Sequence, residues 1–184
     1  HLPLDRSVST ARAVSDGVVV VVPASDVERE GGVAGGASRS ESVRNGLAQV
    51  PADADIVCVH DASRPFASTD LFEQVIAAIR NGADGAIPAI PVTDTIKIVA
   101  SDGSGTVEST PDRSTLVAVQ TPQAFAAVAL RRAHELDKGT STATDDAMLV
   151  ERAGGVVVVV DGESPNRKIT TQDDLEWARR EVEE

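Results

Sequence analysis

Short runs of β-branched residues alternate with helical patterns along most of the chain, and this alternation limits the folds that it can adopt. Continuous apolar runs at 18–22, 56–59 and 156–160 are typical of strands that are covered on both faces. Strands separated by helices predict an α/β fold with a mainly parallel sheet, right-handed crossovers and helices on both faces. The same patterns predict two further strands at 86–90 and 116–120, and helices at 40–49, 70–80, 124–136, 145–153 and from 171 onward.

Capping residues mark where three of the helices begin. Thr69 and Thr144 each stand directly before a predicted helix, and each is the expected N-cap of that helix. Thr171 and Asp174 have the spacing of a capping box, in which the two side chains satisfy each other's backbone N–H groups. These signals predict the starts of the helices.

One segment interrupts the alternation. The β-prone stretches 95–99 and 106–108 flank the turn-forming residues 101–105, which predicts a hairpin. We expect one domain over 1–184 with a projecting hairpin arm at 93–115.

The composition excludes several classes of protein. Apolar residues make up 41% and charged residues 25%, which indicates a globular domain. The formal net charge of −12 argues against a nucleic acid or an anionic membrane as a general partner. The apolar run at 18–22 is too short for a membrane span or a signal peptide. The single cysteine, Cys58, excludes an intramolecular disulfide and suits a reducing, cytoplasmic compartment.

A carboxylate and a guanidinium follow the second apolar run directly. Ligands bind beyond the carboxyl ends of the strands in such sheets, and Asp61 and Arg64 fall there in the segment Val-His-Asp-Ala-Ser-Arg-Pro. Asp61 could hold Mg²⁺ against a nucleotide phosphate, and Arg64 could bind a phosphate through two hydrogen bonds. An Asp61–Arg64 ion pair that only stiffens the loop accounts for the spacing equally well.

Other segments carry weaker signals. Residues 35–42, Gly-Gly-Ala-Ser-Arg-Ser-Glu-Ser, could present backbone N–H groups to an anion, although a glycine turn with a serine cap is the commoner meaning. Residues 166–170 place two cations beside a β-prone stretch. Spacings typical of His and Cys metal ligands, of a serine nucleophile elbow, of a Walker A loop and of a G-x-G-x-x-G turn do not occur.

Taken in order, six segments resemble the 2-C-methyl-D-erythritol 4-phosphate cytidylyltransferase family of the non-mevalonate isoprenoid pathway. Any one of them is weak, but their order and separations are specific, and the resemblance runs from about Leu4 to the C-terminus. The segments are 35–43, 59–65, 91–97, 121–125, 144–147 and 168–170.

The resemblance implies a Rossmann-like fold and a reaction of CTP with 2-C-methyl-D-erythritol 4-phosphate that requires Mg²⁺ and releases pyrophosphate. It assigns Asp61 to the metal and the nucleotide, with Gly36, Ala37 and Ser42 at the cytosine and ribose end. The residues assigned to the sugar phosphate are Arg64, Thr95, Arg113, Thr121, Thr144 and Lys168, of which Lys168 and Arg113, with Asp61, are expected to be catalytic. Thr95 and Arg113 would reach the neighbouring subunit's site, which implies a homodimer joined through the arm.

The family also opens with a strand and a glycine-rich loop that binds the triphosphate, whereas the printed sequence begins at about the next helix. We expect that this segment belongs to the protein. Two alternatives stay open: a D-ribitol-5-phosphate cytidylyltransferase, which shares most of these motifs, and a non-catalytic nucleotide-binding protein if the loop is truly absent.

Overall fold

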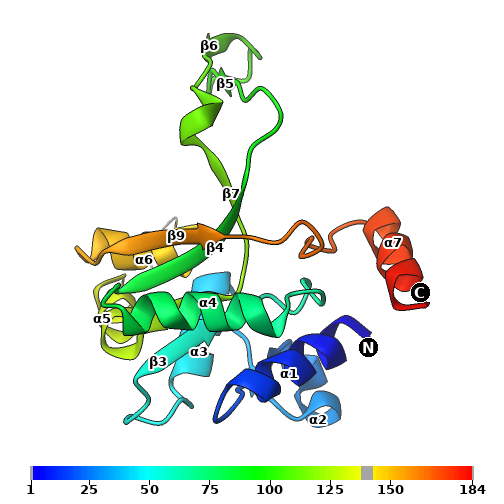
Figure 1. Ribbon diagram of the computed structural model, residues 1–184, viewed down its shortest axis with the longest axis vertical. Coiled ribbons are helices and arrows are strands. Elements are labelled where there is room, and N and C mark those ends of the chain that lie inside the picture. Colours follow the sequence, from blue (N-terminus) through cyan, green and yellow to red (C-terminus); the bar gives the residue numbers. More distant parts are fainter. Residues whose placement is uncertain (1, 138–142, 184) are drawn as a thin grey trace.

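The computed structural model describes residues 2–137 and 143–183, and its main sheet has five strands around β4 (Gly85–Pro91). One edge of β4 pairs in parallel with β9 (Val157–Asp161). The other edge pairs antiparallel with β8 (Gln123–Ala126) near its start and with β7 (Val117–Val119) near its end. β3 (Ile56–Val59) lies beyond β8 and pairs antiparallel with it. Figure 1 shows this sheet crossing the body of the molecule.

The predicted α/β, Rossmann-like class is confirmed, and the strand directions follow from the connections. β3, β4 and β9 run the same way, and a helical crossover at 69–80 connects β3 to β4. β7 and β8 run the opposite way. β7 returns directly from the arm, and β8 follows it after residues 120–122, which contain a cis Thr121–Pro122 bond.

The strand β8 corrects the helix that we predicted over 124–136. That helix, α5 (Ala127–Asp137), begins three residues later, because Gln123–Ala126 pairs with β3 on one side and with β4 on the other. Ala124 and Phe125 are completely buried by this double pairing. A short apolar run fits either a strand or the first turn of a buried helix, so the sequence pattern could not separate the two.

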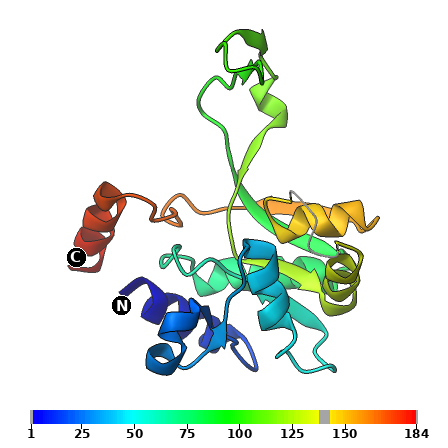
Figure 2. The same ribbon diagram turned by 180° about the vertical axis from the view of Figure 1, so that it is seen from behind.

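Helices cover both faces of the sheet. On one face, Val75 and Ile79 of α4 (Thr69–Arg80) pack against Ala86 and Ala124. The helices on the other face are α3 (Arg39–Leu47), α5 and α6 (Asp146–Arg152), as the two opposite views show (Figures 1 and 2). The sheet therefore lies between two apolar layers, and its strand ends carry the polar loops.

The N-terminal part contains a helix and a two-stranded sheet of its own. α1 (Leu2–Val14) packs against α4. The strand predicted at 18–22 is shorter, as β1 (Val21–Val22), and pairs in parallel with β2 (Val33–Ala34) outside the main sheet. Only Val22 of the five valines is buried, so the predicted cover on both faces is wrong for this run. Valine favours extended backbone, but a longer ladder requires a partner strand along the whole run. The 3₁₀ turn η1 (Ala24–Asp26) and the short helix α2 (Val27–Glu30) connect the two strands.

Two helix caps differ from the prediction by one residue. Ser68 caps α4, because its hydroxyl accepts from the Leu71 N–H, and Thr69 is already helical. Asp145 caps α6 in place of Thr144, and its carboxylate accepts from the Met148 N–H at 2.9 Å. In both cases two capping residue types stand side by side, and the backbone dihedral angles decide between them.

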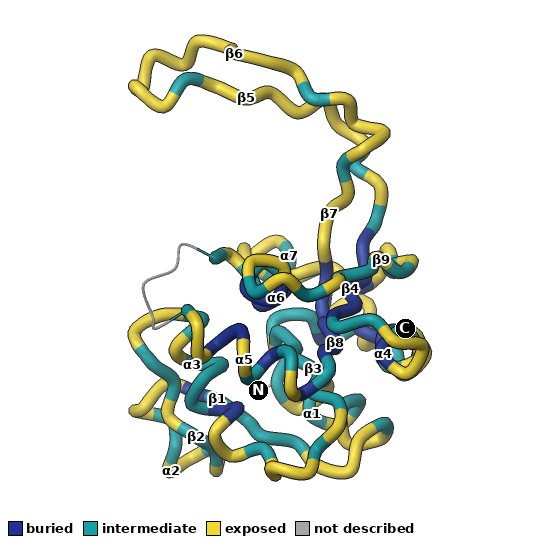
Figure 3. The backbone as a smooth tube through the Cα atoms, turned by 90° about the vertical axis from the view of Figure 1, so that its left-hand side faces the viewer, coloured by how far each residue is buried: buried dark blue, intermediate teal, exposed yellow. Residues whose placement is uncertain are grey.

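The predicted hairpin is confirmed as a projecting element. β5 (Ile98–Val99) and β6 (Val107–Ser109) pair antiparallel, and η2 (Arg113–Thr115) leads back toward β7. Figure 3 shows this arm extending far from the body with an almost fully exposed backbone. Several large apolar side chains of the arm are exposed, among them Ile98 and Val107.

Candidate active site

Asp61 lies two residues beyond the end of β3, and hydrogen bonds of Thr121 and His60 fix the position of its loop. The Asp61 backbone N–H donates to Thr121 Oγ1 at 3.0 Å, and the same oxygen lies 3.0 Å from His60 Nδ1. His60 Nε2 lies 3.1 Å from the carbonyl oxygen of Arg64. A carbonyl oxygen only accepts, so His60 Nε2 carries the ring proton and Nδ1 accepts from the Thr121 hydroxyl. The Thr121 hydroxyl, the Asp61 N–H and both ring nitrogens of His60 are therefore paired.

Burial supports this neutral form of His60. Loss of solvent around the ring lowers the pKa of His60 from 6.5 to about 4, against the smaller opposing effect of the hydrogen bond to the Arg64 carbonyl. The ring also packs against Phe72, with 5.3 Å between the ring centroids. A neutral imidazole with one acceptor nitrogen fits a structural role in orienting the Asp61 loop, a role that was not assigned from the sequence.

Two cations flank the carboxylate of Asp61. Lys168 Nζ lies 2.8 Å from Asp61 Oδ2, and Arg39 Nη2 lies 3.9 Å from Asp61 Oδ1. Burial by itself raises the pKa of Asp61, but the hydrogen bond and charge of Lys168, with the charges of Arg39 and Arg64, outweigh burial and lower it. Asp61 is therefore ionised at neutral pH, although its side chain is only 22% exposed.

Contacts with the sheet loops hold the segment that carries Lys168. The Ile169 N–H donates to the carbonyl of Ser63, two residues beyond Asp61, at 2.8 Å. The side chain of Asn166 is completely buried, and its amide donates to the Thr121 carbonyl at 2.9 Å. Lys168 and Asp61 are 107 residues apart in the sequence, and these contacts help to bring them together in the fold.

The C-terminal helix α7 (Gln172–Glu183) braces the other side of this segment. Asp174 accepts hydrogen bonds from the backbone and hydroxyl groups of Thr170 and Thr171, so the predicted capping box is confirmed. The Arg167 guanidinium lies over the ring of Trp177, 4.5 Å from its centroid, and Trp177 packs edge-on against Phe66. Arg167 therefore links the Lys168 segment to α7.

The guanidinium of Arg64 lies close to two backbone carbonyl oxygens, and its role in phosphate binding stays a prediction. Nη1 donates to the Asn166 carbonyl at 2.8 Å, and Nη2 lies 3.3 Å from the Val119 carbonyl. These bonds join the Asp61 loop, the end of β7 and the Lys168 segment, in place of a direct ion pair with Asp61. The guanidinium also lines a pocket of about 310 Å³ together with Lys168, which places two of the predicted substrate-binding cations around one cavity. The other residues that line this pocket are Ile90, Ala118, Val119, Gln120, Ser164, Arg167, Thr170 and Asp174.

Thr121 has a more internal position than the resemblance implies. Its side chain is 5% exposed, and its hydroxyl proton is donated to His60. Contact with a substrate phosphate would require this bond to break, so its role in phosphate binding stays a prediction.

The segment predicted to bind the nucleotide base folds onto the start of α3. Gly36 N–H donates to Ser42 Oγ at 3.0 Å, and Ala37 N–H donates to the carboxylate of Glu41 at 2.7 Å. A side chain at position 36 would collide with Glu41, because an added Cβ would lie 2.1 Å from Glu41 Cγ. Gly36, Ala37 and Ser42 thus form one compact turn, and its role at the nucleotide stays a prediction.

The remaining predicted residues come from the segment before α6 and from the arm. Thr144 is exposed and directly precedes Asp145, the N-cap of α6. Thr95 and Arg113 lie on the arm, where Arg113 Nη1 donates to the Thr93 carbonyl at 2.8 Å. Figure 3 shows the arm extending away from the body of the molecule.

Sequence reasoning assigned no role to two charged residues near Asp61. Arg39 reaches from the first turn of α3 to Asp146, with 2.6 Å between Nη1 and Oδ2, and Asp146 is completely buried. Both residues occur in segments that carry the family resemblance, at 35–43 and 144–147. Their positions in these motifs were the only signal available, because neither spacing indicates a contact between α3 and α6.

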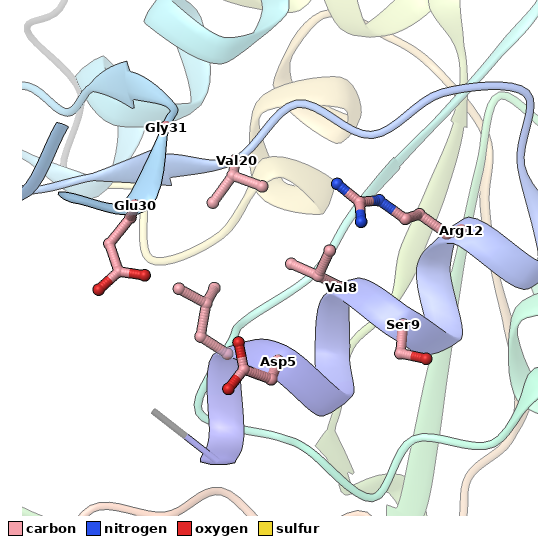
Figure 4. A pocket seen from close by; sticks show the side chains of 8 residues that line it. Asp5, Val8, Ser9, Arg12, Val20, Glu30 and Gly31 are labelled. Carbon is pink, nitrogen blue, oxygen red and sulfur yellow. The ribbon is translucent and has the colours of Figure 1, made fainter. Parts of the chain in front are cut away.

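A second hollow, of about 320 Å³, lies between α1 and the β1–β2 unit (Figure 4). Asp5, Arg12 and Glu30 point into it together with apolar side chains such as Val8 and Val20. None of the predicted site residues line it. Among the described residues, no helix is both long and apolar enough to cross a membrane.

Comparisons with known proteins agree with the arrangement around Asp61. The chain is 50% identical over 177 residues to a 2-C-methyl-D-erythritol 4-phosphate cytidylyltransferase of Rhodococcus jostii, and the aligned region covers 92% of this chain and 76% of the relative. It is also 50% identical over 146 residues to a bifunctional enzyme of Oleidesulfovibrio alaskensis, which covers 78% of this chain, and the chain spans 36% of that relative's length. The crystal structure of 2-C-methyl-D-erythritol 4-phosphate cytidylyltransferase from Thermus thermophilus superposes with a TM-score of 0.86 at 32% identity, over 99% of this chain and 89% of that one.

A family-wide comparison extends this likeness to almost the whole sequence. The profile of the family described as 2-C-methyl-D-erythritol 4-phosphate cytidylyltransferase matches residues 4–184, which include the Asp61 loop, the Lys168 segment and the arm. The chain therefore belongs to the 2-C-methyl-D-erythritol 4-phosphate cytidylyltransferase family.

Proposed function

We propose that the protein transfers the cytidylyl group of CTP to 2-C-methyl-D-erythritol 4-phosphate, with release of pyrophosphate and formation of 4-diphosphocytidyl-2-C-methyl-D-erythritol, a step of isoprenoid precursor biosynthesis. One observation carries the proposal: the ionised carboxylate of Asp61 lies between two cations, Lys168 and Arg39, beside the pocket that Lys168 and Arg64 line. A reaction between two polyanions needs this combination of one metal-binding carboxylate and several fixed positive charges. The names of the relatives support the same activity.

The residues fit a role for Mg²⁺ as cofactor. Magnesium in proteins is commonly held by one or two carboxylates together with substrate phosphates. Asp61 supplies such a carboxylate, and its side chain is 22% exposed, with Arg39 Nη2 3.9 Å from Oδ1. Within residues 2–137 and 143–183, no group of three or more His, Cys, Asp or Glu side chains is arranged to hold a metal ion. This agrees with a metal that binds with the nucleotide and neutralises phosphate charge.

The chemistry requires positioning more than proton transfer. A phosphate monoester has a second pKa near 6, so at neutral pH the substrate is already an anionic nucleophile. Lys168 would hold this phosphate in line with the α-phosphate of CTP, and Arg64 would fix the walls of its pocket through its bonds to the Asn166 and Val119 carbonyls. The neutral His60 would keep Asp61 oriented without taking part in proton transfer.

The experiment that tests this function measures pyrophosphate release from CTP by the complete protein with Mg²⁺ and each of two sugar phosphates. We expect turnover with 2-C-methyl-D-erythritol 4-phosphate and at least about a tenfold drop in kcat/KM for Asp61→Asn, which keeps the size of the side chain and removes its charge. Turnover with D-ribitol 5-phosphate alone would overturn the proposed substrate. No turnover with either one would overturn the proposed activity.

We further propose a cytoplasmic homodimer in which the arm of each subunit completes the site of the other. The exposed apolar residues of the arm and its length support this, because a partner chain could cover these side chains, which are exposed in the described part of the chain. Arg113 would then supply a second phosphate-binding cation, and Thr95 a hydroxyl, to the partner's pocket.

Mixing of inactive subunits tests the shared site. Arg113→Ala and Lys168→Ala proteins should each be inactive, whereas their heterodimer should recover activity, because one of its two sites carries both cations. Heterodimers verified by mass spectrometry that stay inactive would contradict the proposed arrangement.

A further inference from the structure

The most deeply buried charge near the site is the carboxylate of Asp146. This side chain is 0% exposed, and its two oxygens contact Arg39 Nη1 at 2.6 Å and His134 Nε2 at 2.9 Å. The three residues come from α6, α3 and α5, so these contacts join three helices on one face of the sheet. A buried carboxylate is costly unless it is paired and hydrogen-bonded, and here the pairing fixes the guanidinium of Arg39 in one place.

The fixed guanidinium points its other end toward Asp61. Arg39 Nη2 lies 3.9 Å from Asp61 Oδ1, which is too long for a hydrogen bond and leaves donors of this end available. The Arg39 side chain is 36% exposed although its partner Asp146 is buried, so the anchored cation faces solvent beside the proposed metal-binding carboxylate.

The two cations near Asp61 lie at different oxygens of its carboxylate. Lys168 lies on the Oδ2 side, next to the pocket assigned to the sugar phosphate, whereas Arg39 lies on the Oδ1 side. Arg39 is also the first residue of α3 and closely follows the turn that contains Gly36 and Ala37, which is predicted to bind the nucleotide. Arg39 therefore stands between the proposed base-binding turn and the proposed metal ligand.

We propose that Arg39 is a further substrate-binding residue of this site, which donates from Nη2 to a phosphate oxygen of the nucleotide, and that Asp146 is a positioning residue that holds it. The inference rests on the proposed function, since it takes CTP as the ligand. Arginine suits both contacts at once, because its planar fork can donate to Asp146 from one nitrogen and to a phosphate from the other.

The chain offers a matched control for this proposal. Arg44 lies on the same helix, its side chain is also 36% exposed, and it pairs with the nearly buried Asp137 of α5 at 3.4 Å. The Arg44–Asp137 pair joins helices on the same face of the sheet, and its cation is not one of the charges that act on Asp61. Loss of Arg44 should therefore reproduce any general weakening of α3 and leave the proposed phosphate contact intact.

The test is a calorimetric titration of CTP with Mg²⁺ into the complete wild-type protein and into Arg39→Met, Arg39→Lys, Asp146→Asn and Arg44→Met. We expect Arg39→Met to weaken CTP binding about tenfold or more, as for the loss of a hydrogen bond between charged groups, and Arg44→Met to stay within about twofold of wild type. Arg39→Lys should restore little of the loss, because lysine lacks the second nitrogen. Asp146→Asn should weaken CTP binding to an intermediate extent, with Arg39 present but less fixed.

Two further measurements separate a binding role from a structural one. The KM for the sugar phosphate should change less than about threefold in Arg39→Met, and the binding of cytidine, which has no phosphate, should stay unchanged. Thermal melting of each variant shows whether it is folded. If Asp146→Asn does not fold, Arg39→Met and Arg39→Lys still test the proposed contact.

Several results would overturn the inference. These are unchanged CTP binding in folded Arg39→Met, an equal loss in Arg44→Met, or an equal loss of cytidine binding, which would place Arg39 at the base or ribose. Turnover by wild type with D-ribitol 5-phosphate alone would overturn the proposed sugar substrate and leave the contact of Arg39 with CTP standing. A wild-type protein that binds no CTP would overturn both.

Discussion

The hydroxyl of Thr121 has a measurable structural role, which the substitution Thr121→Val isolates. The hydroxyl is buried, accepts from the Asp61 N–H and donates to His60 Nδ1. Valine has nearly the same shape but leaves both partners unpaired. An unpaired buried polar group costs about 1–3 kcal/mol. Because Asp61 and His60 are only partly buried and water can replace part of the loss, we expect a total of about 2–4 kcal/mol.

Urea denaturation of the wild type, Thr121→Val and Thr121→Ser measures this cost. Serine keeps the hydroxyl and loses one methyl group, which costs about 1 kcal/mol, so Thr121→Val should be about 1–3 kcal/mol less stable than Thr121→Ser. The slopes of the unfolding curves should agree, since a change of slope would indicate a different unfolded or folded state. A Thr121→Val protein that is no less stable than Thr121→Ser would refute this role of the hydroxyl.

Three further outcomes follow from the site. Burial lowers the pKa of His60 to about 4, below 6.5 in the unfolded chain, so the stabilising contribution of the neutral ring is present above pH 6.5 and is lost as the pH falls toward 4. In this window the free energy of unfolding of the wild type should fall by up to about 1.4 kcal/mol per pH unit more than that of His60→Gln. Equal changes with pH in the two proteins would show that His60 does not titrate as inferred. Lys168→Ala should weaken binding of the sugar phosphate, measured by calorimetry, about tenfold or more with little change in CTP binding, and an equal loss of both would contradict its assignment to the sugar phosphate. Trp177 is the only tryptophan and stacks on Arg167, next to Lys168, so its fluorescence should change when the sugar phosphate binds; binding seen by calorimetry without a fluorescence change would count against the link.

The pattern of the sequence predicted several elements almost residue by residue. Ile56–Val59 is a strand as expected, and the capping box of Thr171 and Asp174 forms. These features depend on neighbours within a few residues, so local propensity and spacing are sufficient to predict them. The strand Gln123–Ala126 was missed for the opposite reason, because its pairing with β3 and β4 is a contact between distant parts of the chain.

The same distinction applies to the site. Asp61, Arg64 and Lys168 were identified from motifs, since each lies in a short segment whose residue types indicate phosphate and metal chemistry. The contacts among these residues could not be predicted from the sequence. Whether Arg64 pairs with Asp61 depends on the carbonyl of Asn166, which lies 102 residues further along the chain and accepts a hydrogen bond from Arg64.

The sequence by itself therefore determined the α/β class, the arm and the residue types of the site, because periodicity, turn chemistry and motifs are local properties of a chain. Only the tertiary structure decided that His60 is partly buried and neutral, that the Thr121 hydroxyl is hydrogen-bonded to it, and that Asp146 holds Arg39 beside Asp61. Burial, pKa and pairing depend on what the fold places around a group, and strands and helices far apart in the sequence supply those surroundings.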